Sequence, residues 1–188
     1  MTIALPRHLT TEELEAGLDD VRRSPGDEGV LQMIVRRPAV GNREVLQEGE
    51  LDPVVGLVGD TWSKRSSRRT FDGGPHPDMQ LNIMNARVVA LVAQAKERWP
   101  LAGDQLFVDM DLGEGNLPPG TRLRLGSAVI EVTAQPHTGC GKFTERFGVD
   151  AMKFVNSITY KALHLRGINA RVVTGGTIRV GDRLKKLS

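Results

Sequence analysis

The most constraining feature of the sequence is a series of short, strand-like segments separated by glycine-containing turns. The clearest pair covers residues 121–125 and 128–133, where apolar and polar side chains alternate on both sides of Gly126-Ser127. A period of two places the apolar residues of a strand on one face. A two-residue turn that begins with glycine is typical of a type II′ hairpin. These residues therefore predict an antiparallel pair of strands with one buried face.

Further strand-like segments occur at 29–36, 44–47, 54–58, 81–84, 105–110, 168–173 and 177–180. Gly175-Gly176 lies between the last two and indicates a second hairpin. Helical periodicity is found at 10–23, 87–98, 140–147 and 150–165. This order predicts an α+β fold with a mostly antiparallel, β-barrel-like core and flanking helices. Closure of the barrel would remove the exposed edges that short strands otherwise leave.

The N-terminal helix is expected to be an appendage that packs on the main body. Thr10 or Thr11 can cap it, and Ser24-Pro25 ends it. In the helix at 150–165, Val155, Ile158 and Leu163 are expected on the buried side. A chain of 188 residues is long enough for one well-buried core. We therefore divide it into an N-terminal helical appendage, residues 1–28, and one main domain, residues 29–188.

The composition indicates a soluble protein of the cytoplasm. Apolar residues make up 39% of the chain, charged residues 26%, and the net charge is +2. The N-terminal residues do not form a signal peptide, and no apolar run is long enough to span a bilayer. The single cysteine excludes an internal disulfide framework, and in the cytoplasm its thiol would stay reduced.

Arginines form two groups in the sequence. Arg65, Arg68 and Arg69 lie in the irregular polar stretch 61–78, which is long for a simple connection, and Arg166 and Arg171 lie near the C-terminus. Each group is either a solvated surface or a site for an anion such as phosphate or a nucleic acid. Aromatic residues make up only 4% of the chain, which weakens stacking on single strands. Nucleic acid is therefore not the expected partner.

The single cysteine, Cys140, lies between a strand-like and a helix-like segment and has a glycine on each side. Free backbone N–H groups at a helix start, together with Lys142 and Arg146, would favour the thiolate over the thiol. A thiolate can bind a soft transition metal or accept sulfur as a persulfide. The alternative is that Cys140 is a small buried apolar residue, as free cysteines often are.

His137, three residues before Cys140, could accept a proton, donate a hydrogen bond or bind a metal. One histidine and one cysteine are too few for a closed structural zinc site. The other three histidines show no ligand spacing. No phosphate loop, dinucleotide-binding fingerprint or zinc-protease motif occurs in the chain. His137 is therefore treated as a residue that supports the thiol.

The order of several short motifs resembles a MOSC domain, the module named after the C-terminal region of molybdenum-cofactor sulfurases. The resemblance covers roughly residues 30–186, and its motifs lie at 59–60, 72–74, 102–106, 113–117, 120–126, 128–133, 136–140, 166–173 and 176–182. It implies a β-barrel-containing fold and a role in molybdenum-cofactor binding or sulfur transfer. The family's cysteine corresponds to Cys140. The stretch 61–78 departs from the family form, because Trp62 and a serine-arginine run follow Gly59-Asp60 in place of a histidine-glycine motif.

The resemblance implies a first hypothesis, in which Cys140 is the catalytic residue and the ligand of the metal in a molybdenum cofactor. The protein would then reduce N-hydroxylated or similar substrates with electrons from an external donor. Because the pterin carries a phosphate, polar and cationic residues near the thiol are candidate cofactor contacts. These are His137, Thr138, Lys142, Arg146, Arg166, Asn169 and Arg171.

Two alternatives remain open. In the first, Cys140 carries a persulfide that it receives from a cysteine desulfurase, and no cofactor is bound. In the second, the chain is an anion- or nucleic-acid-binding module without catalysis, built on residues 65–69. The sequence leaves the substrate and the oligomeric state open.

Overall fold

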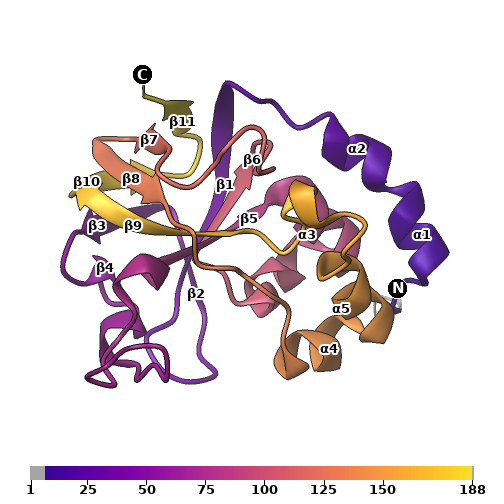
Figure 1. The fold of residues 1–188 in the computed structure, drawn as a ribbon, viewed down its shortest axis with the longest axis horizontal. Coiled ribbons are helices and arrows are strands. Elements are labelled where there is room, and N and C mark those ends of the chain that lie inside the picture. The colour runs from indigo at the N-terminus through magenta and orange to yellow at the C-terminus, as the bar shows by residue number, and fades with distance from the viewer. Residues whose placement is uncertain (1–6, 188) are drawn as a thin grey trace.

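The computed structural model describes residues 7–187, and its centre is a closed barrel of seven strands with helices on one side (Figure 1). In order around the barrel, the strands are β1 (Glu28–Arg36), β6 (Leu106–Asp109), β5 (Leu81–Asn85), β9 (Ile168–Thr174), β8 (Ala128–Val132), β7 (Arg122–Leu125) and β11 (Arg183–Lys186). Neighbouring strands are antiparallel except for β5 and β6, which are parallel. The predicted α+β barrel is confirmed.

β1 closes the barrel because it is long enough to pair with two neighbours. Its first residues pair with β11, with Glu28 opposite Lys185, and its middle residues pair with β6. A bulge between Leu31 and Met33 interrupts the register with β6 and lets the strand bend, as closure requires. The end of β1 also pairs with β2 (Glu44–Leu46), which extends the sheet beyond the barrel.

A second sheet of three strands lies beside the barrel. It consists of β10 (Gly176–Arg179), β3 (Glu48–Asp52) and β4 (Gly56–Leu57). The expected hairpin between 168–173 and 177–180 is therefore wrong, because β10 pairs with β3 and not with β9. β9 already has β5 and β8 on its two edges, so it has no free edge for β10. The glycine pair at 175–176 instead carries the chain from the barrel to the second sheet.

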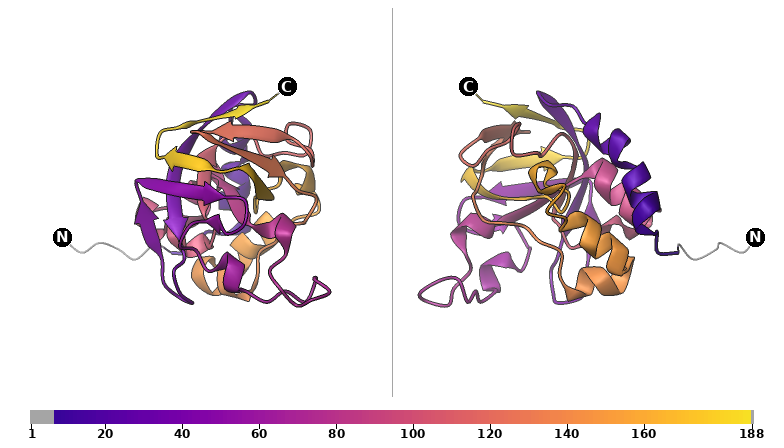
Figure 2. Two further views of the ribbon diagram at one scale, coloured as in Figure 1. Left: turned by 90° about the vertical axis from the view of Figure 1, so that its left-hand side faces the viewer. Right: turned by 45° about the vertical axis from the view of Figure 1, so that its right-hand side comes forward.

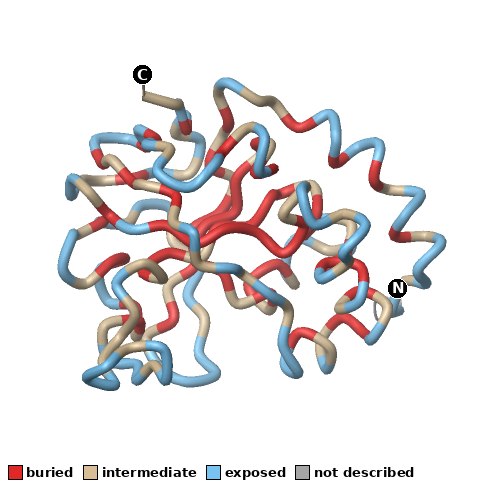
Figure 3. Tube along the Cα trace, in the orientation of Figure 1, coloured by how far each residue is buried: buried red, intermediate tan, exposed pale blue. Residues whose placement is uncertain are grey.

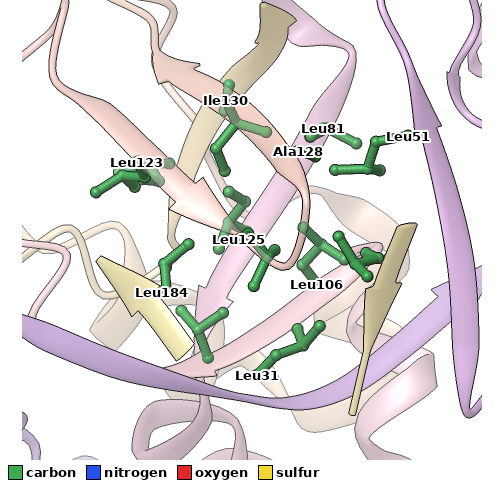
Figure 4. Packing of buried hydrophobic residues seen from close by; sticks show 14 of the residues in the cluster. Leu31, Leu51, Leu81, Leu106, Leu123, Leu125, Ala128, Ile130 and Leu184 are labelled. Carbon is green, nitrogen blue, oxygen red and sulfur yellow. The ribbon is translucent and has the colours of Figure 1, made fainter. Parts of the chain in front are cut away.

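The interior of the barrel is aliphatic. Leucines such as Leu31, Leu106 and Leu125 point inward from different strands and contact one another (Figure 4). The alternate residues of the same strands face outward: Phe107, between the inward Leu106 and Val108, is fully buried under the helices. The strands at the centre are thus buried on both faces (Figure 3).

Helices cover the outer face of β1, β5 and β6. They are α1 (Thr11–Ala16), α2 (Leu18–Arg22), α3 (Ala86–Ala93), α4 (Gly141–Phe147) and α5 (Val149–Val155), with 3-10 turns at Trp62–Lys64, Pro77–Met79, Lys96–Ala102 and Lys161–Leu163. The expected helix at 10–23 is divided at Gly17, whose Cα approaches Leu91 so closely that a Cβ would lie 2.6 Å from it. Leu14, Leu18 and Val21 pack into the same outer cluster as Phe107.

Two of the expected helices are shorter than their sequence pattern indicated. α3 ends at Ala93, and the segment up to Ala102 is a 3-10 turn that contains Pro100. α5 ends at Val155, so Ile158 is 89% exposed instead of buried. Asn156, the residue after Val155, bonds to the backbone of Gly139 through both atoms of its side-chain amide (2.8 and 3.2 Å). α5 therefore ends at the residue whose side chain anchors the segment that contains Gly139.

Gly167 lies at a close backbone contact that leads to a testable prediction. Its φ is +109°, and a Cβ there would lie 2.1 Å from the carbonyl oxygen of Ile83. Gly181 has a similar φ of +96°, but a Cβ there would meet nothing within 4 Å. We expect Gly181→Ala to cost about 1 kcal/mol of unfolding free energy, from backbone strain alone. Gly167→Ala should cost about 3 kcal/mol or more, because β5 and β9 must separate. If the two variants lose the same free energy of unfolding in urea, the close contact between Gly167 and Ile83 is contradicted.

Candidate functional site

The candidate site is organised by the strap, residues 133–140, which crosses from β8 to α4 (Figure 1). Exposure alternates along it: residues 133, 135, 137 and 139 are half-buried, and residues 134, 136, 138 and 140 are exposed. The strap is thus an extended segment with one face against the protein and one toward solvent. Thr138 and Cys140 lie on the solvent face.

Each residue of the inner face is anchored. The hydroxyl of Thr133 donates to the carbonyl of Asp78 (2.6 Å), and the amide of Asn169 donates to the carbonyl of Gln135 (3.1 Å). At the other end, Gly139 bonds to Asn156, the residue that follows α5. These anchors come from residues far apart in the chain, so they fix the strap to the finished fold.

The strongest anchor is His137. Its Nε2 lies 2.7 Å from Oδ1 of Asp104, and the carboxylate of Asp104 is completely buried. Nη1 of Arg166 donates to both oxygens of the same carboxylate (2.9 and 2.7 Å), and Nη2 donates to the carbonyl of Ala102 (2.9 Å). The guanidinium also lies over Phe143 in α4, with Cζ 5.1 Å from the ring centroid.

The buried group carries one acid and one permanent cation. Burial alone would raise the pKa of Asp104, but the charge of Arg166 and the contact with His137 outweigh it, so the pKa lies below its ordinary value. Burial lowers the pKa of His137, and Arg166 acts in the same direction, against the opposing effect of Asp104. At neutral pH, Asp104 is therefore ionised and His137 neutral.

The lowered pKa of His137 predicts a loss of stability in mild acid. The unfolded chain takes up a proton on this histidine below its ordinary pKa of 6.5, whereas the folded protein does so only at lower pH. The unfolded state then binds more protons, so the free energy of unfolding falls as the pH drops below about 6.5, by at most about 1.4 kcal/mol per pH unit. The free energy of unfolding is measured in urea from about pH 7.5 to 5. In His137→Gln it should fall less steeply with decreasing pH than in the wild type, and in the exposed control His8→Gln it should fall as in the wild type. The same pH dependence in His137→Gln and the wild type would contradict the assignment.

Cys140 is a free, exposed thiol at the N-cap of α4, and it makes no capping hydrogen bond there. The alternative of a small buried apolar residue is thereby excluded. Its backbone carbonyl accepts from the N–H of Phe143 (2.9 Å) and of Thr144 (3.1 Å). The backbone at Cys140 is thus fixed on both sides while the sulfur faces solvent.

A second buried ion pair lies at the same end of the barrel. Arg37, just after β1, donates from Nε and Nη2 to the two oxygens of Asp60 (2.8 and 2.7 Å), and both side chains are almost completely buried. Nη1 of Arg37 also donates to Asn82 (3.1 Å), whose Nδ2 donates to Oδ1 of Asn169 (2.6 Å). A continuous set of hydrogen bonds thus runs from Asp60 to the strap.

Three further arginines lie near these pairs: Arg43, Arg65 and Arg146. None of them has a carboxylate partner among residues 7–187. Burial, followed by repulsion from Arg146 and Arg37, lowers the pKa of Arg43. Burial and the charge of Arg37 do the same for Arg65, although Arg65 lies at the surface. This end of the molecule therefore carries more cations than anions.

The residues named from the sequence fall into separate groups. His137 and Arg166 meet at Asp104, and Asn169 donates from Nδ2 to the strap at Gln135 while its Oδ1 accepts from Asn82. Arg146 is half-buried and donates to the carbonyl of Leu101 (2.6 Å), whereas Lys142 is exposed. Arg171 lies on the outer surface of β9 and pairs with Glu131 (2.7 Å).

Sequence reasoning missed Asp104, Arg37 and Asp60 as parts of the site. Asp60 and Asp104 both lie within motifs of the family resemblance, at 59–60 and 102–106, but neither was singled out. The sequence separation is 62 residues for Asp104 and Arg166 and 23 for Arg37 and Asp60. Arg37 gave no clear signal, because it directly follows another arginine, Arg36, at the end of β1.

The fold and the strap with its exposed cysteine define a MOSC-type domain. The model of the MOSC domain family matches residues 72–185, more than half of the chain, and the chain belongs to this family. β1 precedes the matched range, although it closes the barrel.

Solved structures of similar fold include the YuaD protein from Bacillus subtilis, with a TM-score of 0.57 and 16% identity over 84% of this chain and 94% of that one. YiiM from Escherichia coli has a TM-score of 0.53 and 23% identity over 85% of this chain and 70% of that one. YiiM from Geobacillus stearothermophilus has a TM-score of 0.50 and 14% identity over 85% and 73%. At these identities the likeness concerns the fold alone. A comparison with curated proteins gave no match.

The described part of the chain contains neither a group of metal ligands nor a helix that could span a membrane. No three histidine, cysteine or acidic residues within 7–187 are placed so that they could together hold a metal ion. Over the same residues, no helix has both the length and the apolar character needed to cross a membrane.

Proposed function

We propose that this chain is a molybdenum-cofactor-binding MOSC protein in which Cys140 is the protein ligand of the metal. The observation that carries the proposal is an exposed thiol at the end of a strap anchored at every second residue. Such a thiol is accessible to a ligand and held in one place, which limits the entropy lost on binding. A reducing compartment such as the cytoplasm would keep it free.

The residues present fit an anionic cofactor that brings its own metal. A cysteine thiolate suits a soft transition metal, and guanidinium groups suit a phosphate. Arg146 lies in the helix that begins after Cys140, and Lys142 is two residues from the thiol. The start of α4 and the connection from β4 to β5, which carries Arg65, lie at the same end of the molecule (Figure 2). These cations could balance a phosphate near the thiol.

In this function the bound cofactor supplies the redox chemistry. Cys140 holds the metal, and the cationic residues orient the anionic part of the cofactor. The buried carboxylate of Asp104, with His137 and Arg166, fixes the strap and therefore the position of the sulfur. The substrates are N-hydroxylated or similar oxidised-nitrogen compounds, and a separate redox protein delivers the electrons.

We also propose that residues 29–188 form the domain and that residues 1–28 are its N-terminal helical extension. In support, β1 lies outside the matched range but completes the barrel through β6 and β11. α1 and α2 pack on the barrel through three apolar side chains, so the extension would be a cover for the outer face of the sheet.

The proposal is tested by purification from a host that makes the cofactor. We expect molybdenum and pterin in roughly equal amounts, at up to about one of each per chain, measured by mass spectrometry and by fluorescence of the oxidised pterin. Protein from a host that cannot make the cofactor is the control and should contain neither. Protein without molybdenum from the competent host would contradict the proposal.

The same exposed thiol supports a second candidate, a sulfur-transfer module. In that reaction the Cys140 thiolate attacks the outer sulfur of a desulfurase persulfide. A sulfur–sulfur bond forms on Cys140, and the desulfurase leaves as a thiolate. Intact mass measurement after incubation with a desulfurase and cysteine would show one added sulfur that a reductant removes. This adduct on protein free of molybdenum would favour the second candidate, and its absence would exclude it.

A further inference from the structure

A cavity beside the strap has not been assigned above. Its volume is about 470 Å³, within the range of small-molecule sites. It lies between the strap, the end of α5, the segment before β9 and the loop before β7. Cys140, Arg43 and Arg65 do not line it. The thiol therefore lies outside it, whereas three of the candidate cofactor contacts, His137, Thr138 and Arg166, line it.

Most of the walls are apolar. Leu117, Val132 and Leu165 are buried residues on different sides of the cavity, and Pro136 of the strap forms another part. Ile158 also lines it and is 89% exposed. Exposed large aliphatic side chains next to an apolar cavity favour a ligand with an apolar body.

The lining also has polar residues, among them Glu114 and Lys161. Two histidines, His137 and His164, are the ones whose free acceptor atoms can be assigned. Nε2 of His137 faces a carboxylate, which can only accept, so Nε2 carries the proton and Nδ1 is left as an acceptor. Nδ1 of His164 lies 2.9 Å from the carbonyl of Leu112, so Nδ1 carries the proton and Nε2 is the acceptor. Within residues 7–187 neither acceptor has a protein donor.

Neither acceptor is sealed from solvent. In the described part of the chain, Nε of Arg166 is the one buried side-chain nitrogen or oxygen without a hydrogen bond. The two free imidazole nitrogens are therefore accessible, and the cavity that their rings line offers the access. Because both free nitrogens can only accept a hydrogen bond, they select ligands that donate one.

The backbone of His164 points to the same conclusion. Its φ of +46° is a left-handed conformation that costs a non-glycine residue free energy. Such residues gather at functional sites because the surrounding structure holds them there. Here the hydrogen bonds from Gly167 to the carbonyl of His164 (2.7 Å) and from the imidazole to Leu112 hold it. The result is that the imidazole lines the cavity.

We propose that this cavity binds a small molecule with an apolar body and at least one O–H or N–H donor, which the free nitrogens of His137 and His164 accept. The probes below do not need a cofactor at Cys140. A ligand there contacts residues of both faces of the strap, including Thr138, but not Cys140.

The probes are phenol, which has one O–H donor, and anisole, which has the same ring but no donor. Two-dimensional NMR titration of the full chain should show saturable shifts around the cavity, with phenol binding about fivefold to tenfold more tightly than anisole, as expected for one hydrogen bond. Equal affinity for the two probes, no binding, or shifts centred on Trp62 and Arg65 would overturn the proposal.

His164→Gly removes one acceptor, and glycine adopts the left-handed backbone without strain. We expect it to weaken phenol binding about fivefold and to leave anisole binding unchanged. His137→Gln removes the other acceptor and should weaken phenol further if the variant folds. His76→Gln, a histidine outside the cavity, is the control and should bind phenol like the wild type. Phenol binding that is unchanged in His164→Gly would contradict the assignment.

Discussion

Asp104→Asn is expected to lower the free energy of unfolding by about 3–5 kcal/mol, the usual cost of removing one partner from a buried ion pair. The carboxylate of Asp104 is completely buried and is the only acid that Arg166 contacts in residues 7–187. Without its charge, the guanidinium of Arg166 stays buried and uncompensated, and His137 loses the acceptor that fixes it. The measurement is urea unfolding monitored by circular dichroism.

Asp109→Asn is the matched control. Asp109 makes the same kind of contact with Arg87 (2.8 Å), but 28% and 26% of the two side chains are exposed. Partly exposed pairs contribute at most about 1 kcal/mol. The double variant Asp104→Leu/Arg166→Leu should recover part of the loss, because no charge then remains buried. If Asp104→Asn costs no more than Asp109→Asn, the buried pair does not have the role assigned to it.

Cys140→Ser is expected to remove at least nine-tenths of the bound molybdenum and to leave the fold unchanged. Replacing a residue that only hydrogen-bonds to a metal ligand usually lowers the affinity for the metal 10-fold to 100-fold. Replacing the ligand itself should lower that affinity at least as much. The thiol is exposed and makes no capping hydrogen bond, so stability should change by less than about 0.5 kcal/mol. Molybdenum per chain and urea unfolding are measured on the same preparations.

Thr159→Ser is the control for this second prediction, because it is a small change at an exposed residue that is not part of the strap. It should retain the molybdenum of the wild type. Unchanged molybdenum in Cys140→Ser would mean that the cofactor, if bound, does not use this thiol. Lost molybdenum together with a large loss of stability would mean that Cys140 is structural, contrary to its exposure.

The barrel could be predicted from the sequence because its signal is local. Alternation within residues 121–133 and a glycine turn were sufficient to place β7 and β8. The second hairpin failed because the choice of partner is not local: β9 has neighbours on both edges, so β10 pairs with β3. The early end of α5 has a similar cause, since Asn156 bonds to Gly139, seventeen residues away in the chain.

Cys140 could be singled out from the sequence, but the buried residues that anchor the strap could not. Nothing in the spacing of Asp104 and Arg166 indicates that their side chains meet, because the barrel brings their strands' ends together. His137 was predicted to support the thiol. The alternating exposure of the strap places its ring on the inner face and Cys140 on the outer face.

The most direct test of the account is X-ray absorption at the molybdenum edge on wild type and Cys140→Ser purified from a cofactor-competent host. If Cys140 is the protein ligand, the wild-type spectrum contains one more molybdenum–sulfur contribution than the cofactor alone supplies. Whatever molybdenum remains in Cys140→Ser lacks that contribution. Spectra with the same number of sulfur ligands in both proteins would contradict the central claim.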